Sequence, residues 1–145
     1  MDTVRKLLDD KGTTIWSIEP DASVYDAVKL MTLQDLGALA AVVDGRLVGM
    51  ISERDCARHI VRGKKSAKET QVRDIMTIEV IYAQPQTPMD ECMAIMSEHH
   101  IRHMPILDGD KLVAMISLRD LADVIVKEQD MKIKELETLS YYHGT

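Results

Sequence analysis

Two Ser-x-x-Asp motifs, Ser52 to Asp55 and Ser117 to Asp120, carry the sharpest chemical signal in the chain. Each follows an aliphatic run and precedes a helical pattern, so each marks the end of a strand and the start of a helix. Such a motif can form a capping box, in which the serine and the acid satisfy free backbone donors. The same carboxylate can also accept hydrogen bonds from ribose hydroxyls, while helix-end N–H groups attract phosphate. Capping alone and nucleotide binding are both open interpretations.

The two motifs belong to an internal repeat. The segment Leu47 to Asp55 returns as Leu112 to Asp120, with a shift of 65 residues. Ala41 to Asp44 matches Pro105 to Asp108 with a shift of 64, which predicts one extra residue in the second turn and gives Pro105 the place of Ala41. A duplicated supersecondary unit closes its open apolar faces against its copy. The predicted fold class is α/β, with two pseudo-symmetric β-α-β-β-α repeats packed as one module.

Hydrophobic periodicity places the elements that position the first motif. A short strand is predicted over 15–18, and Ser23 caps a helix whose apolar stripe runs from Val24 to Met31 at positions i, i+3, i+4 and i+7. The apolar runs 39–43 and 47–51 flank an Asp-Gly step, which is a hairpin signal. The motif and a second helix follow directly.

The repeat divides the chain into three parts. Residues 1–65 form the first repeat with a short lead-in helix at its start, and residues 66–130 form the second repeat with a similar lead-in at 71–76. Residues 131–145 form a C-terminal helical tail, which either packs on a partner subunit or frays on its own domain. The polar, basic segment Gly63 to Thr70 is the predicted linker.

Composition and charge limit the function classes. The formal net charge of −6 argues against a general nucleic-acid binder. No apolar run approaches the roughly 20 residues of a membrane span. Cys56 and Cys92 lack the spacing of a disulfide framework or a zinc knuckle, which fits a reducing compartment. We therefore expect a soluble, cytoplasmic protein that binds neither nucleic acid nor membrane.

Local charge differs from the overall balance. Arg54, Arg58 and Arg62 recur every fourth residue and therefore share one face of a helix, and several lysines follow. One interpretation is a solvated helix face with a basic linker, and the other is a positive rim that attracts phosphate. Both can hold at once.

The histidines His99, His100 and His103 suggest a metal site, because His99 and His103 are four residues apart and can share a helix face. The competing interpretation is that these residues end a helix and enter a strand, and no acid or thiol at ligand spacing completes the set. No metal site is therefore predicted. No Ser/His/Asp, Cys/His or paired-acid constellation is identifiable in the sequence either, so no catalytic residues and no enzymatic activity are expected.

The repeat from Leu39 to Asp55, with its second copy around His103 to Asp108, strongly resembles the cystathionine beta-synthase (CBS) domain family. Two repeats resemble a tandem CBS pair, often called a Bateman module, and the likeness covers almost the whole chain. The resemblance implies that the pair binds an adenine nucleotide in two related clefts between the sheets. AMP, ADP, ATP and NAD are the implied ligands, S-adenosylmethionine ranks below them, and no catalytic cofactor is implied.

The family pattern sets the Asp of one repeat beside the first strand and the hairpin entrance of the other. It implies that the carboxylates hold ribose, that apolar side chains sandwich adenine, and that Arg54, Arg102, Arg119 and His103 meet phosphate. One implied cleft combines Met115, Ser117, Arg119 and Asp120 with Thr13, Thr14, Ile18, Gly37, Ala38 and Leu39. The other combines Met50, Ser52, Arg54 and Asp55 with Thr77, Val80, Arg102, His103, Met104 and Pro105.

The resemblance implies a regulatory sensor module that responds to its nucleotide through a conformational or dimer change. The alternative is a ligand-free dimerisation or scaffold protein of the same fold, and an enzyme is the third choice. Lone CBS pairs resemble modules that form flat dimers, so a homodimer is expected. Because no effector domain is recognised in the sequence, an unidentified protein effector would have to read the change.

Overall fold

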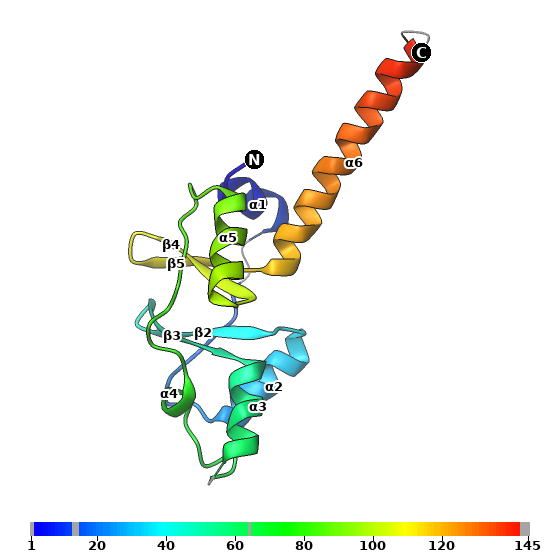
Figure 1. Cartoon of the computed structure of the whole chain (residues 1–145). Coiled ribbons are helices and arrows are strands. Elements are labelled where there is room, and N and C mark those ends of the chain that lie inside the picture. Colours follow the sequence, from blue (N-terminus) through cyan, green and yellow to red (C-terminus); the bar gives the residue numbers. More distant parts are fainter. Residues whose placement is uncertain (1, 13–14, 64, 143–145) are drawn as a thin grey trace.

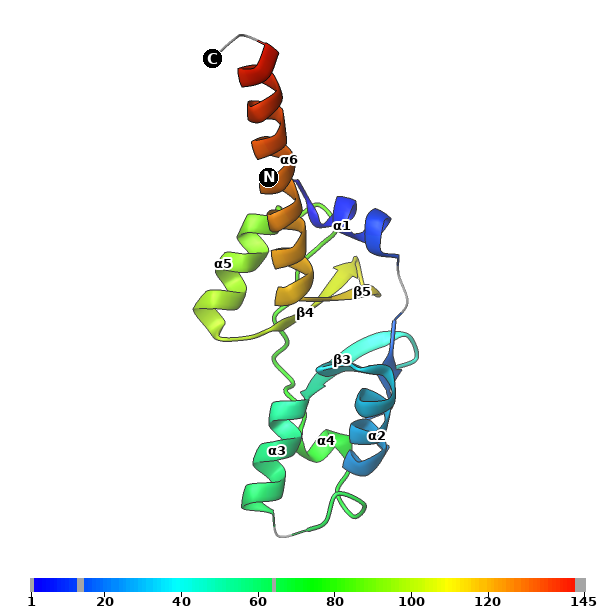
Figure 2. The ribbon, with the colours of Figure 1, turned by 90° about the vertical axis from the view of Figure 1, so that its right-hand side faces the viewer.

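The computed structural model describes residues 2–12, 15–63 and 65–142. The chain forms two halves, each with a β-hairpin and helices on the outer side of the hairpin (Figure 1). The hairpins face each other across the middle of the molecule, and the helices lie on the far sides (Figure 2). Strands from the two hairpins, β3 (Arg46–Ser52) and β5 (Lys111–Ser117), are in contact there. The predicted α/β class with two pseudo-symmetric repeats is confirmed.

The first half contains β1 (Ser17–Ile18), α2 (Val24–Gln34), β2 (Ala38–Val43), β3 (Arg46–Ser52) and α3 (Glu53–Arg62). β1 runs parallel to β2, and β2 pairs antiparallel with β3. Ser23 caps α2 as predicted, because its Oγ accepts a hydrogen bond of 3.0 Å from the Asp26 N–H. The apolar stripe of α2 faces the core, although Val28 at its edge keeps 36% of its surface exposed.

The second half contains α5 (Met89–His99), β4 (His103–Asp108), β5 (Lys111–Ser117) and α6 (Leu118–Tyr142). Within the described part of this half, no strand corresponds to β1. Its place is taken by a single parallel bridge between Ala83 and Ile106. The Ala83 N–H donates to the Pro105 oxygen at 3.1 Å, and the Leu107 N–H donates to the Ala83 oxygen at 2.9 Å. Pro85 lies two residues further on, as Pro20 does after β1, and prevents the pairing from continuing in that direction.

The two hairpins have the same length, so the predicted extra residue in the second turn is wrong. Ala40 pairs with Met50, and Pro105 pairs with Met115, so Pro105 takes the place of Ala40 and not of Ala41. Two residues separate the strands in both turns. A shift of 64 matches the Asp-Gly step at 44–45 with the Asp-Gly step at 108–109 by residue identity alone. The backbone instead keeps a shift of 65, and the first turn residue with positive φ is an aspartate in one copy and Gly109 in the other.

Two lead-in helices, α1 (Val4–Lys11) and α4 (Val72–Ile75), are exchanged between the halves. Apolar residues of α1 join the core of the second half, whereas Val72 joins the core of the first half. Backbone bonds fix both helices, since the Val4 N–H donates to the Thr87 oxygen at 2.9 Å and the Val72 N–H donates to the Ala22 oxygen at 2.8 Å. Each sequence repeat therefore supplies a helix to the other repeat's core. The lead-in assigned to residues 1–65 packs with residues 83–121.

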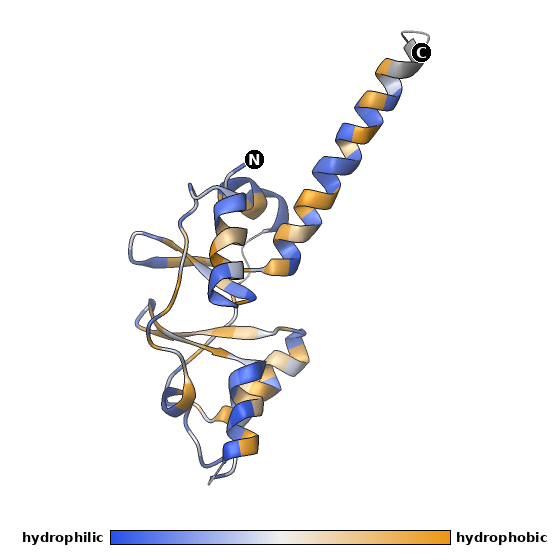
Figure 3. Cartoon of the chain, in the orientation of Figure 1, coloured by the Kyte–Doolittle hydropathy of each residue, from blue (hydrophilic) through white to orange (hydrophobic). Residues whose placement is uncertain are grey.

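The last helix, α6, runs without a break from the second core into a projecting segment (Figure 1). The boundary expected at residue 131 lies inside this helix. Leu121 is fully buried at its base, but the projecting part carries apolar and charged side chains in alternation (Figure 3). Its exposed apolar residues are Val126, Met131, Ile133, Leu136 and Leu139.

Cys56 and Cys92 are free thiols that lie in separate cores, Cys56 in the first half and Cys92 in the second. Burial raises the pKa of each thiol to about 11, with nearby acids adding to the effect. Both are therefore protonated and poorly nucleophilic at neutral pH. Across the described residues, none of the helices is long and apolar enough to cross a membrane.

Candidate functional site

A cavity of about 720 Å³ lies where the two halves meet at the start of α3. One wall comes from β2, β3 and α3 of the first half, and the other comes from the end of α5 and the start of β4. The segment that leads from α4 into the second half closes a third side. We call this space the Asp55 cleft, because the first Ser-x-x-Asp motif lines it.

Nine of the ten residues expected at this cleft line the same cavity. The expected residues that line it are Met50, Ser52, Arg54, Asp55, Thr77, Val80, Arg102, His103 and Pro105. Met104, the remaining residue expected here, is fully buried in the core of the second half. His103 and Pro105, on either side of it in β4, line the cleft, because successive side chains of a strand point to opposite faces. Contact with a nucleotide stays a prediction for all of these residues.

Ser52 and Asp55 form a capping box at the start of α3. The Ser52 N–H and the Ser52 hydroxyl each donate to Oδ2 of Asp55 at 2.9 Å, and the Asp55 N–H donates back to the Ser52 Oγ at 3.1 Å. Both bonds to the carboxylate end on Oδ2. Among the described residues, Oδ1 of Asp55 has no hydrogen-bond donor. Capping therefore leaves Oδ1 free to accept from another donor.

The segment after α4 is held against β3 by backbone bonds. The Met50 N–H donates to the Thr77 oxygen at 2.9 Å, and the Thr77 N–H donates to the Met50 oxygen at 2.8 Å. Gly49 permits this approach, because a Cβ there would lie 2.5 Å from the Met76 sulfur and 3.0 Å from the Thr77 oxygen. These contacts set Thr77 and Val80 along the side of the cleft.

Charged side chains of both signs line the cleft. Arg54 and Arg58 reach it from α3, and Arg102 reaches it from the residue before β4. Glu53 and Glu79 also line it, so the local charge is mixed with basic groups on both halves. Guanidinium groups bind phosphate through paired, charge-assisted hydrogen bonds. The arrangement can hold an anionic group between the two halves.

His103 contributes a neutral ring rather than a charge. Burial lowers the pKa of His103 below its usual value, and this outweighs the opposing effect of Glu53 and Asp120. Arg102 and Lys11 lower the pKa further. The ring packs closely on Gly37, where a Cβ would lie 2.6 Å from its Cε1. At neutral pH the His103 ring is therefore neutral and can donate or accept one hydrogen bond without adding a positive charge.

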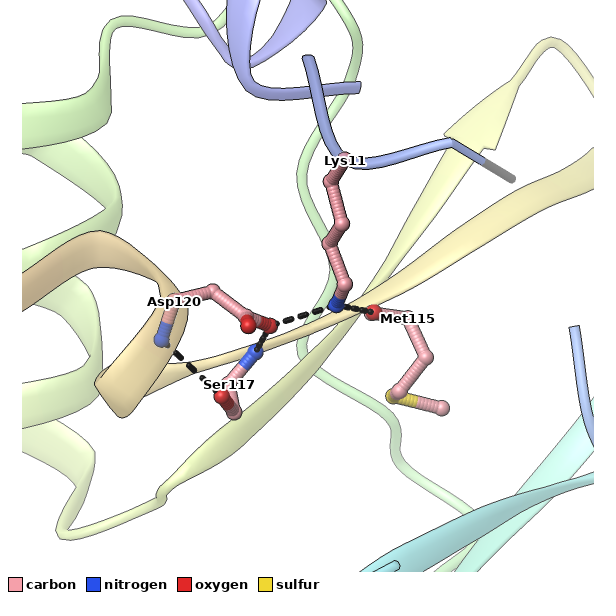
Figure 4. A network of polar contacts seen from close by, with 4 residues as sticks. All are labelled: Lys11, Met115, Ser117 and Asp120. Carbon is pink, nitrogen blue, oxygen red and sulfur yellow. Dashed lines mark hydrogen bonds and ion pairs between the residues drawn. The ribbon is translucent and has the colours of Figure 1, made fainter. Parts of the chain in front are cut away.

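The second motif has a different environment. The Ser117 N–H donates to Oδ2 of Asp120 at 2.8 Å, and the Asp120 N–H donates to the Ser117 Oγ at 3.1 Å. Lys11, at the end of α1, places its Nζ 2.6 Å from the same Oδ2 and 3.3 Å from the Met115 oxygen (Figure 4). Burial would raise the pKa of Asp120, but the hydrogen bonds from Lys11 and Ser117 outweigh it and hold the pKa below its usual range.

The residues expected at the Asp120 cleft lie in several parts of the described structure. Gly37 and Ala38 line the Asp55 cleft. Leu39 is fully buried because its side chain joins the core of the first half, and Ile18 packs against that same core. Arg119 is exposed at the start of α6. Thr13 and Thr14 lie outside the described residues.

Several cleft residues were not assigned to the site from sequence. Arg58 was detectable, since it lies one helical turn after Arg54 in the basic stripe. His99 and His100 stand at the end of α5, which confirms that they close a helix. Within the described ranges, no group of three or more His, Cys, Asp or Glu side chains is placed to hold a metal ion. The other cleft residues missed from sequence are Glu53, Ala57, Glu79, Ile81 and Ile101.

Comparison with known families gives a match to the CBS domain at residues 12–62 and again at residues 72–127. The CBS domain-containing protein CBSX3, mitochondrial, of Arabidopsis thaliana is 38% identical over 136 residues. That alignment covers 90% of this chain and 64% of the plant protein, so the chain spans just under two thirds of that relative.

Solved structures show the same architecture. The crystal structure of a CBS domain designated NE2398 has a TM-score of 0.84 at 39% identity, covering 87% of this chain and 99% of that one. The CBS domain pair of protein MJ0100, solved with 5′-methylthioadenosine and S-adenosyl-L-methionine, has a TM-score of 0.79 at 24% identity. It covers 88% of this chain and 98% of that one, and at this identity the likeness shows the fold alone.

Proposed function

The chain belongs to the CBS domain family and carries two copies of the domain. We propose that it is a regulatory module that binds an adenine nucleotide in the Asp55 cleft. The observation that carries the proposal is the arrangement of one carboxylate oxygen and several guanidinium groups around one cavity between the halves. The module has no catalytic role in this proposal.

Each part of a nucleotide finds matching chemistry in the cleft. Oδ1 of Asp55 accepts from the ribose hydroxyls while Oδ2 continues to cap α3. Met50 and Val80 lie on two sides of the cavity and provide apolar surface for the adenine ring. Arg54 and Arg102, with Arg58 beside them, bind phosphate from opposite halves.

The proposed ligands are AMP, ADP, ATP and NAD. The ligands of the MJ0100 CBS pair are adenosine derivatives, which makes this class the first to test here. S-Adenosylmethionine ranks below the phosphate-bearing nucleotides because it has no phosphate for Arg54, Arg58 and Arg102 to bind.

A ligand in this position bridges the two halves and can therefore change how they pack. Regulation requires that the ligand binds two arrangements with unequal affinity. A separate protein would read the difference. A cytoplasmic location stays a prediction, since the Arabidopsis relative is named as mitochondrial.

The exposed apolar residues of α6 favour a second candidate function, a dimerisation scaffold. The projecting part of α6 exposes Ile133, Leu136 and Leu139 with 55%, 59% and 54% of their surfaces accessible. Apolar side chains at this spacing on one helix favour packing on another helix. The scaffold and the sensor are compatible, and they differ in whether a nucleotide is required.

Thermal unfolding with each nucleotide tests the proposal. A ligand at about 100 times its dissociation constant adds roughly 2.7 kcal/mol of stability. We expect AMP, ADP, ATP or NAD to raise the unfolding temperature, and GTP to raise it less. If no adenine compound shifts the transition, the sensor is rejected and the scaffold remains.

A further inference from the structure

We propose that Lys11 acts as a built-in competitor for the Asp120 carboxylate, so that the two pseudo-equivalent nucleotide positions of the module are unequal. This inference rests on the proposed function, since it concerns how the same ligand class is admitted at the second motif. It assigns to Lys11 a role in selecting which position is filled.

The contrast with the first half carries the inference. The two lead-in helices correspond at Val4 and Val72, but α1 continues to Lys11 whereas α4 ends at Ile75, so Lys11 lies in a turn that α4 lacks. The residue that follows α4 is Met76. Met76 packs its thioether against Gly49 beside β3 and brings no charge to the Asp55 motif. Lys11 instead places an ammonium 2.6 Å from Asp120. The exchanged lead-in segments thus bring an apolar group to one motif and a cation to the other.

The position of Lys11 coincides with the space that a ribose would need. Figure 4 shows its side chain reaching from the end of α1 between Asp120, at the start of α6, and Met115 on β5. Met115 is the counterpart of Met50, which lines the Asp55 cleft. The ammonium bonds to Oδ2, which also accepts from the Ser117 N–H, and it reaches the Met115 oxygen. A ribose that approaches Oδ1 of Asp120 from the side of Met115 therefore competes with the ammonium for the space between them.

The strength of the contact sets the size of the effect. The side chains of Lys11 and Asp120 keep 41% and 23% of their surfaces exposed. A partly exposed ion pair contributes little binding free energy, so a ligand can displace Lys11 from Asp120 at a modest cost in affinity. Removing it should tighten binding at Asp120 by about fivefold.

The test isolates the Asp120 position and uses adenosine as the probe, because adenosine has the ribose hydroxyls but no phosphate. Calorimetric titrations compare Asp55→Ala with Asp55→Ala/Lys11→Met. The matched control is Asp55→Ala/Lys6→Met, since Lys6 lies on the same helix and its ion pair is with Asp2 at 2.9 Å. We expect about fivefold tighter adenosine binding with Lys11→Met and no change with Lys6→Met.

Unchanged, weaker or undetectable adenosine binding in the Lys11→Met variant would overturn the competitor role. A parallel titration with AMP separates the other chemistry: if Lys11 binds phosphate, its removal weakens AMP binding, which also contradicts competition. The wild-type protein and Asp55→Ala keep the two proposals apart. Loss of AMP binding at the Asp55 cleft in Asp55→Ala supports the proposed function, whatever the Lys11 variants show.

Discussion

Met50 and Thr77 exchange two backbone hydrogen bonds, of 2.9 and 2.8 Å, although they come from different sequence repeats. The bridge fixes the segment that connects the halves against the strand that leads into the Asp55 motif. Two walls of the cleft are therefore positioned by one contact. The absence of a side chain at Gly49 allows that contact to form.

Gly49→Ala should weaken both the fold and ligand binding. The new Cβ meets Met76 and the Thr77 oxygen, and overpacking of this kind costs about 1 to 3 kcal/mol. Urea unfolding and AMP titration measure the two effects. Met76→Ala and the double variant complete a mutant cycle, and a favourable coupling is expected because the smaller residue relieves part of the clash. Strict additivity would show that Met76 is not what the new Cβ meets.

His103 should make stability depend on pH. Because burial lowers its pKa in the folded protein, the unfolded chain binds a proton first as the pH falls. Its contribution is therefore complete above the ordinary histidine pKa of about 6.5 and is lost as the pH falls below that value. Urea unfolding at pH 7.5 and pH 5.5 should show a smaller loss for His103→Gln than for the wild type. Equal losses would mean that His103 titrates alike in both states.

The exchange of α1 predicts which half is weakened by a mutation near the N-terminus. Leu8 is 3% exposed in the second core, and Leu8→Ala should cost about 2 to 5 kcal/mol. Thiol labelling distinguishes the halves, because Cys92 lies in that core and Cys56 in the other. In native conditions Leu8→Ala should accelerate labelling of Cys92 more than that of Cys56. Preferential labelling of Cys56 would contradict the packing of α1 in the core of the second half.

Self-association through α6 has its own test. Ile133→Lys/Leu136→Lys puts charges on the exposed apolar face of the projecting helix and should convert a dimer to a monomer in light scattering. Val61→Lys is the matched control, since Val61 is 87% exposed on α3. A wild-type monomer at tens of micromolar, or a dimer broken only by Val61→Lys, would contradict a dimer held by α6.

Much of the fold was predictable because its signals are local. The Asp-Gly step predicted a hairpin, Ser23 predicted a helix start, and the Ser-x-x-Asp motifs predicted caps that the structure contains. The exchange of α1 and α4 was not predictable, since the two lead-ins resemble each other and periodicity does not say which core a helix joins. The prediction of one extra residue in the second hairpin turn was wrong for a related reason, because residue identity does not fix strand register.

Some residues of the candidate site could also be predicted from local sequence patterns, and others could not. Arg58 follows from helix spacing, whereas Glu79 lies on an irregular segment with no pattern to mark it. The contact of Lys11 with Asp120 joins residues 109 positions apart in the chain. Such a pair depends on tertiary packing, and the sequence alone carried no signal for it.

The most direct test of the central claim is calorimetric titration of AMP into the wild type and Asp55→Ala, with Asp74→Ala as the control. Asp74 also belongs to a capping box, at α4, but it does not line the cleft, so it reports the loss of a cap alone. Hydrogen bonds to a charged group are worth roughly 1.5 to 3 kcal/mol. Asp55→Ala should therefore weaken AMP binding at least about tenfold, while Asp74→Ala leaves it unchanged. Equal affinity in the wild type and Asp55→Ala would contradict nucleotide binding at this carboxylate.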